Sequence, residues 1–440
     1  MKTAINPIVN FKMGSNQQVS VNFLKYFFSF LSLERGRQWR SLRRGGVAVA
    51  IACLMGVSGV PLWRSAPALA QDEAAFPPNP LEPDVTDPLY PELLVDRPLS
   101  PQERRVLTTA LDELNAQATA QYQAGNIPGA IDLWLRELRL RRILGVQEEV
   151  PALARVGEVA WRESQTTEVR LVTERLQAIE QEVWLQTPTD YALLTMIAQA
   201  YEQMRAIEPA TALYQQLLAR ARQEGNVVQE QAILVSLGEL YLIWFDYPNA
   251  AAAYLELLAM ARSQGNPQLE IDYLEKLEFI YQQGRLLEEA IAIQQELVQR
   301  YEAMQALLEL SPLKLAIGDN FVALGRPDLA APSYQEAFSI ARSVQQYGFA
   351  GDALRRLATL YRSLDRPNDA LVVYQLLIDV AQQSYDQLSI MDTYDQIGQL
   401  HRDLGNTAQA LQAFQRGLQI AQQLNYKISY FNTQIEELRQ

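Results

Sequence analysis

The feature that most constrains this chain of 440 residues is a pattern of small and aromatic side chains that returns every forty residues. In its clearest copy, Gly238 and Tyr241 lie on one face of an expected helix, and Ala250 and Tyr254 lie on one face of a second. Pro248 falls in the first turn of that second helix, where its missing N–H costs nothing. Each copy therefore predicts two short helices packed back to back, with the small residues allowing close approach.

The same positions can be followed along most of the chain. The copy with Glu278 and Gln294 is weaker, and the one near Gly157 is degenerate and one residue out of phase. The first small position of successive copies is filled by Ala118, Gly157, Ala198, Gly238, Glu278, Gly318, Ala358 and Gly398. Units that stack only on their neighbours form a solenoid. The sequence therefore predicts an all-α solenoid of about eight units.

Small, aromatic, small, aromatic at these offsets resembles the tetratricopeptide repeat, a helix–turn–helix unit that stacks into a superhelix. That family's usual unit has about 34 residues, so forty implies longer helices. The resemblance implies a right-handed α-solenoid and a protein-binding function. The charged run between Trp134 and Leu144, with the acidic, Gln-rich composition, also resembles exported repeat proteins of cyanobacteria.

Residues 1–70 have the features of an export signal. A basic region precedes an apolar run, Val47–Leu62, that is shorter than the span of about 20 residues that crosses a membrane. Ala68-Leu69-Ala70 fits the small-x-small cleavage rule and predicts a mature start at Gln71. We expect an exported protein, in the periplasm or, in a photosynthetic source, the thylakoid lumen. The alternative is an uncleaved leader that anchors the chain in the membrane.

The remaining boundaries follow from composition and capping signals. Residues 71–99 are rich in proline and acid, which predicts an extended, solvated linker that spaces the array or packs loosely along its first unit. Ser100-Pro101-Gln102-Glu103 is a capping box that starts the repeat array, residues 100–425. Residues 426–440 predict a last amphipathic helix that caps it.

Charge and residue usage argue against several functions. The net charge is −13, and because residues 1–70 carry +8, the rest carries −21 and should repel nucleic acid and anionic lipid. The only cysteine, Cys53, lies in the leader, and the only histidine, His401, replaces an aromatic core residue of its sister units. We therefore expect no catalytic residues, no metal site and no cofactor, and contact with a membrane only through an uncleaved leader.

The family resemblance implies that the first helices line a concave groove. Its groove positions lie three residues before, one after and four after each first small residue. The partner-binding residues expected from this rule are Val235, Glu239, Leu242, Glu275, Phe279, Gln282, Leu315, Asp319, Val322, Arg355 and Arg362. The rule also selects Thr359, Asp395, Gln399 and Arg402. The groove should be apolar with acids in its middle and basic at its far end, unless these side chains belong to a wider core.

Such a groove predicts a non-catalytic scaffold that binds a peptide or helix of a partner protein, in the assembly of an envelope or membrane complex. The alternative is a sensor whose superhelix changes shape when it binds a peptide or small molecule. Family members that hold acidic C-terminal tails use paired Lys and Asn in neighbouring units. Here those places hold Thr195, Val235, Glu275 and Leu315, so that clamp is not expected.

Overall fold

The computed structural model describes residues 79–91 and 97–439. Of the two units into which the chain divides, these residues belong to the second, Pro77–Gln440. The predicted leader, its cleavage site and Cys53 lie outside the described residues. The account below therefore concerns the second unit.

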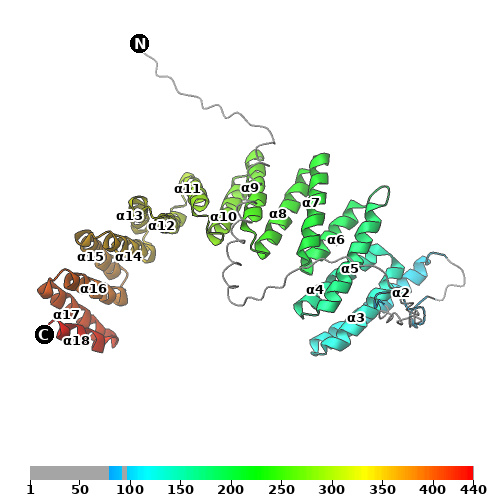
Figure 1. Ribbon diagram of the computed structural model, residues 1–440, viewed down its shortest axis with the longest axis horizontal. Helices are drawn as coiled ribbons and strands as arrows, with labels where there is room; N and C mark the ends of the chain where they lie inside the picture. Colours follow the sequence, from blue (N-terminus) through cyan, green and yellow to red (C-terminus); the bar gives the residue numbers. More distant parts are fainter. Residues whose placement is uncertain (1–78, 92–96, 440) are drawn as a thin grey trace, which may run out of the picture. The chain divides into compact units, whose positions relative to one another are not determined.

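Every regular element in the described part of the chain is a helix (Figure 1). The helices are α2 (Pro101–Gln123), α3 (Ile127–Arg141), the 3₁₀ turn η1 (Arg142–Leu144), α4 (Val146–Arg162), α5 (Thr166–Trp184), α6 (Tyr191–Gln203), α7 (Ile207–Glu224), α8 (Val227–Ile243), α9 (Tyr247–Ser263), α10 (Pro267–Gln283), α11 (Leu287–Ala303), α12 (Leu307–Ala323), α13 (Pro327–Ser343), α14 (Tyr347–Ser363), α15 (Pro367–Gln383), α16 (Gln387–Asp403), α17 (Thr407–Leu424) and α18 (Ile428–Glu437).

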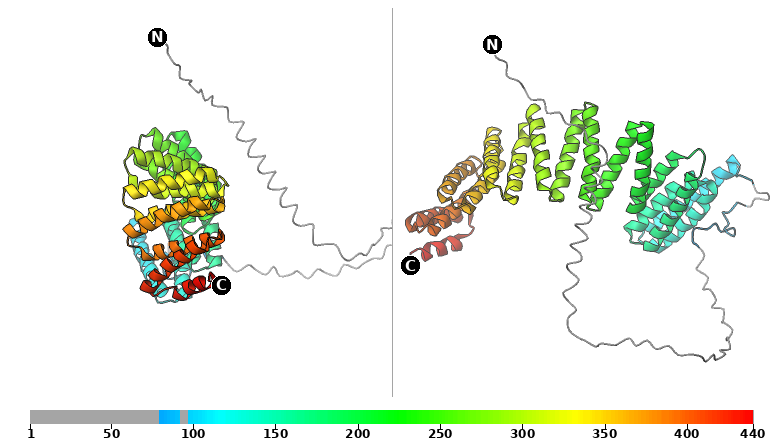
Figure 2. Two further views of the ribbon diagram at one scale, coloured as in Figure 1. Left: turned by 90° about the vertical axis from the view of Figure 1, so that its left-hand side faces the viewer. Right: turned by 45° about the horizontal axis from the view of Figure 1, so that its top comes forward.

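The helices pair in chain order, from α2 with α3 to α16 with α17, and each pair is one of the predicted units. Figure 2 shows the pairs following one another without any later helix returning to an earlier one. The last helix, α18, packs on α17, where the ring of Phe431 lies against Gly417. The prediction of an all-α solenoid of eight helix pairs is confirmed.

The linkers between helices are as regular as the helices. From Ile207 to Thr407 a new helix begins every twenty residues, and the residue two places before each start, beginning with Arg205, has a positive φ. The amide after it bonds back to the preceding helix, as Asp246 N does to the carbonyl of Tyr241 at 2.9 Å. This closes the helix end as the Schellman motif does. The two turns of a unit are therefore alike.

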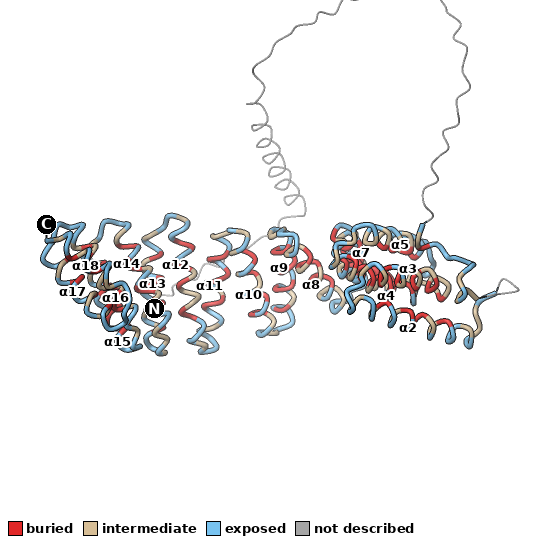
Figure 3. The backbone as a smooth tube through the Cα atoms, turned by 90° about the horizontal axis from the view of Figure 1, so that it is seen from below, coloured by how far each residue is buried: buried red, intermediate tan, exposed pale blue. Residues whose placement is uncertain are grey.

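The core is a layer of apolar side chains running between the helices, and Figure 3 shows one buried stripe on each helix in turn. The small and aromatic positions lie in this layer: Ala250 is fully buried, and Tyr254 packs against Gly238. The pattern that recurs every forty residues therefore arises from the close contact between the two helices of each unit.

The weak fifth copy keeps its polar residues inside the core. Gln294 is fully buried, donates from Nε2 to Glu278 at 2.8 Å and accepts from Asn320 at 3.0 Å. The amide therefore links α10, α11 and α12 where the sister units use an aromatic ring. On the first helix of the last unit, His401 has the place that Tyr241 has in the fourth unit. Both side chains are half-buried, as expected for a ring that replaces tyrosine.

The segment before the array is packed more closely than its composition suggested. Leu81 is buried in the core, and Arg142 donates to its carbonyl at 2.7 Å. Asp87 pairs with Arg136 at 2.7 Å, and this hydrogen bond holds the pKa of Asp87 below its usual range. For residues 79–91, the contacts of Leu81 and Asp87 agree with the expected packing along the first unit, although most of the segment is exposed. The capping box at Ser100 is present as predicted, with its amide donating to Glu103 at 2.7 Å.

Candidate functional site on the first helices

The first helices of successive units are joined to one another on one side of the array. Helix α4 contacts α6 directly, and α12 contacts α14. Side chains also join them: Lys276 of α10 reaches Glu239 of α8 at 2.9 Å, and Arg356 of α14 reaches Asp319 of α12 at 2.9 Å. We call the surface formed by the predicted groove positions on α8, α10, α12, α14 and α16 the inner face.

The middle of the inner face presents apolar surface. Phe279 is 49% exposed and Val322 is 45% exposed, although both lie on the helices that carry the core. Val235 and Leu242 are half-buried and pack against the core. Leu315 differs, because at 4% exposed it belongs to the core and offers a partner almost no surface.

The acids of the inner face are held by the protein itself. Glu239 accepts from the hydroxyl of Tyr254 at 2.6 Å, in addition to its ion pair with Lys276. Burial raises the pKa of Glu239, but these two hydrogen bonds outweigh it and leave the pKa below its usual range. Asp319 is held in the same way, by Tyr334 at 2.7 Å and by Arg356.

Two further predicted polar residues lie on α10. The carboxylate of Glu275 is exposed and accepts a hydrogen bond from the hydroxyl of Tyr301. Gln282, near the end of α10, is half-buried. Acids therefore border the apolar patch of Phe279 without forming a cluster of free carboxylates.

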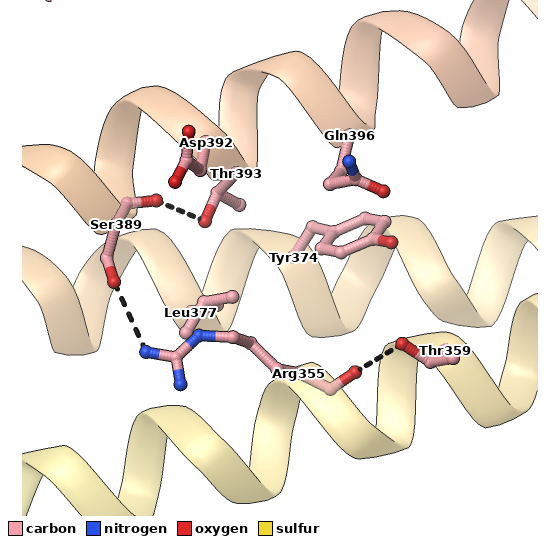
Figure 4. A pocket seen from close by; sticks show the side chains of 8 residues that line it. All are labelled: Arg355, Thr359, Tyr374, Leu377, Ser389, Asp392, Thr393 and Gln396. Atoms are coloured by element: carbon pink, nitrogen blue, oxygen red, sulfur yellow. Dashed lines mark hydrogen bonds between the residues drawn. The ribbon is translucent and has the colours of Figure 1, made fainter.

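The basic end of the inner face contains a hollow of about 220 Å³ between α14, α15 and α16 (Figure 4). A neighbouring hollow of about 250 Å³ shares Arg355, Leu377 and Ser389 with it. The first hollow is lined by Arg355, Thr359, Tyr374, Leu377, Ser389, Asp392, Thr393 and Gln396. One predicted binding residue, Arg355, thus lies where the surface is recessed.

The polar groups around the hollow are oriented by bonds between helices. Arg355 donates to Ser389 Oγ at 3.3 Å and forms an ion pair with Asp352, while Arg362 donates from Nη1 to Gln396 Oε1 at 2.8 Å. Figure 4 shows the ring of Tyr374 between Gln396 on one helix and Arg355 on another. The arrangement can offer hydrogen-bond donors to a group that enters between α14 and α16.

The groove rule overlooked several residues of this site. Tyr374 has the second-helix aromatic place of Tyr254, which the repeat pattern assigns to the contact between helices, and Ser389 and Gln396 lie outside the three positions chosen in each unit. The sequence does contain a signal for these bridging residues, because Lys276, Arg356 and Gln396 lie at the same position of the forty-residue repeat. The rule considered each first helix alone and did not include the side chains that bridge to the next.

Within residues 79–91 and 97–439, no group of three or more His, Cys, Asp or Glu is placed to hold a metal ion. Nor is any helix in that part long and apolar enough to cross a membrane.

Stacked helix pairs with small and aromatic residues at their contacts define a helical-repeat protein. Residues 349–423, which include every residue that lines the first hollow, match the model of the tetratricopeptide repeat family. This part of the chain is thus of the tetratricopeptide-repeat type. That repeat is generally a non-catalytic interaction scaffold.

Solved structures with similarity to the chain were also found. BtubC from P. vanneervenii is 17% identical, with 50% of this chain and 92% of that chain covered and a TM-score of 0.34. MamA is 18% identical, with 46% and 94% covered and a TM-score of 0.32. The apo form of RapI is 12% identical, with 75% and 97% covered and a TM-score of 0.35. No curated protein matches the chain.

Proposed function

We propose that this protein is a non-catalytic scaffold whose inner face binds a peptide or helix of a partner protein. The observation that carries the proposal is the exposure of Phe279 and Val322, 49% and 45%, at predicted groove positions of two neighbouring first helices, α10 and α12. Large apolar side chains left exposed together on one surface are characteristic of interaction sites.

The expected mechanism is contact at several points on a preformed surface. Phe279 and Val322 would bury apolar side chains of the partner, and the hollow beside Arg355 would accept a polar group further along it. The helices are fixed by cross-links such as Glu239–Lys276 and Arg362–Gln396. Little ordering of the scaffold would then oppose binding.

We further propose that the protein works outside the cytoplasm, in the assembly of an envelope or membrane complex. The basis is the leader, residues 1–70, with its basic region, apolar run and Ala68-Leu69-Ala70 site. Mass spectrometry of the protein from its native host should find a peptide that begins at Gln71. A protein that keeps the leader and binds cytosolic partners would contradict export.

The binding proposal is tested by purifying the tagged protein from its host and comparing two double variants. Phe279→Ala with Val322→Ala removes the apolar patch of the inner face. The matched control, Leu255→Ala with Val372→Ala, removes side chains 44% and 64% exposed on the second helices α9 and α15. We expect the first variant to lose a stoichiometric partner that the control retains. If both variants keep or lose the partner equally, the inner face is not the binding surface.

A further inference from the structure

A three-residue arrangement recurs on the inner face. An acid on a first helix accepts from a tyrosine hydroxyl fifteen residues later and from a cation thirty-seven residues later, on the next first helix. In the fourth unit the acid is Glu239, with Tyr254 at 2.6 Å and Lys276 at 2.9 Å. The sixth unit repeats it with Asp319, Tyr334 and Arg356. Each carboxylate has a donor on either side.

The hollow lies where the seventh unit has the same arrangement without its acid. The three places there hold Thr359, Tyr374 and Gln396, and all three residues line the hollow. Tyr374 is 4% exposed, and its hydroxyl makes no hydrogen bond to any residue that the structure describes. Because Gln396 Oε1 accepts from Arg362, its amide nitrogen remains available to donate. The hydroxyl of Tyr374 and the amide of Gln396 are therefore two donors that lack the carboxylate present between such groups in the fourth and sixth units.

No acid among the residues that the structure describes takes the missing place. In the third unit, where the acid place holds Gln199, the hydroxyl of Tyr214 donates instead to Glu202 at 2.7 Å. The residue at the place of Glu202 in the seventh unit is Arg362, which cannot accept. Tyr374 is therefore the one tyrosine at this place, among the described units, whose hydroxyl makes no hydrogen bond to a carboxylate.

The charges near the hollow would also tolerate an entering anion. Asp392, the acid in its lining, is paired with Lys427 at 2.9 Å, and Asp352 is paired with Arg355. The nearest carboxylate oxygen to Arg362 is that of Asp403, at 3.8 Å. Both acids are thus paired with cations, while the ion pair of Arg362 with Asp403 is a long one.

We propose that the hollow binds a carboxylate side chain, aspartate or glutamate, of the peptide held on the inner face. Its oxygens would take the place of the Asp319 carboxylate, accepting from the hydroxyl of Tyr374 and the amide of Gln396 between the guanidinium groups of Arg355 and Arg362. This specificity rests on the proposed peptide-binding function. It differs from a clamp of paired Lys and Asn, because a single internal carboxylate accepts from a tyrosine hydroxyl and a glutamine amide, with two arginines beside it.

The test uses the full chain with ¹³C-labelled tyrosine rings, titrated with N-acetylglutamate amide and, at equal ionic strength, with its neutral isostere N-acetylglutamine amide. The Tyr374 signal is assigned by its loss in Tyr374→Phe. We expect it to shift saturably with the acid, and the amide to bind about tenfold or more weakly, since hydrogen bonds to a charged group are the stronger. Equal shifts with both compounds, or no shift with either, would overturn the proposal.

Variants separate this site from the rest of the inner face. Thr359→Asp restores the acid of the sister units and should abolish the response to N-acetylglutamate amide. Tyr334→Phe alters the complete arrangement at Asp319 and should leave the response unchanged. If Thr359→Asp has no effect while Phe279→Ala with Val322→Ala still loses a partner, the carboxylate site is wrong and the scaffold function stands. If partner binding is also insensitive to the inner face, both proposals fail.

Discussion

The ring of Tyr254 occupies the space that a side chain on Gly238 would need. A Cβ at Gly238 would lie 2.6 Å from the ring, closer than real Cβ contacts allow. The same tyrosine holds Glu239, the next residue along α8, through its hydroxyl at 2.6 Å. The small–aromatic pair of the repeat therefore sets both the distance between α8 and α9 and the position of an inner-face acid.

Gly238→Ala should accordingly destabilise the protein by about 1–3 kcal/mol, because the methyl group must displace a packed ring. Urea unfolding followed by circular dichroism would measure the change. Gly348→Ala is the matched control: it also lies in a helix, but a Cβ there meets nothing within 4 Å. That change should be neutral or stabilising by up to about 1 kcal/mol. A Gly238→Ala protein as stable as the wild type would refute the close contact.

The left-handed linker residues give a second prediction. Arg285 has a φ of 54°, whereas Gly325 holds the same linker place one unit later with a φ of 69°. Arg285→Gly should stabilise the protein by about 1 kcal/mol, because only glycine adopts this conformation without cost. Gly325→Ala should destabilise it by a similar amount. The two midpoints of urea unfolding should move in opposite directions, and movement in the same direction would show that the linkers are not equivalent.

The pH dependence of stability tests the bonds to Glu239. The pKa of Glu239 is lower in the folded protein than in the unfolded chain, where it is about 4.3. The ionised carboxylate therefore stabilises the fold above about pH 4.3, and this stabilisation is lost as the pH falls through the folded pKa. Glu239→Gln should therefore be less stable than wild type at pH 7, with the difference shrinking below about pH 4. Thermal unfolding at a series of pH values would measure it. A constant difference at all pH values would mean that ionisation of Glu239 does not matter.

The buried amide link tests how the fifth and sixth units are joined. Asn320→Leu leaves Gln294 Oε1 buried without its donor, which should cost about 1–3 kcal/mol. Adding Gln294→Leu removes the stranded acceptor but also leaves Glu278 without its partner. The triple variant with Glu278→Ala restores the small residue of the sister units and should recover much of the loss. Chemical denaturation of the three proteins would decide, and a double variant as stable as wild type would argue against a linked network.

The fold could be predicted because its signal is repeated. A small residue opposite an aromatic one carries little information in one unit, but the same pair recurs at Gly318 and Tyr334, and at Gly398 and Phe414. Each unit buries the same kind of contact, so the sequence period reproduces the structural one. The fifth unit, where Glu278 and Gln294 replace the pair, keeps its frame because hydrogen bonds take over the contact.

The site could be predicted only in outline. The place three residues before the small residue lies at the margin of the core, so that Leu315 turns inward while Arg355 remains in solvent. Position alone therefore did not decide exposure. The bonds that place Glu239 and Gln396 depend on how far side chains reach between neighbouring first helices. That reach follows from the packed geometry rather than from any one helix pattern.

The twenty-residue linker spacing means that the chain can change length without a new junction. Removing residues 247–286 would join Asp246 directly to Leu287, putting one helix-capping residue in the place of another and leaving turn and helix starts in register. Gain or loss of forty residues thus preserves the alternation of first and second helices, while a change of twenty would exchange their roles. Such an array can be lengthened or shortened to fit its partner by duplicating or losing whole units.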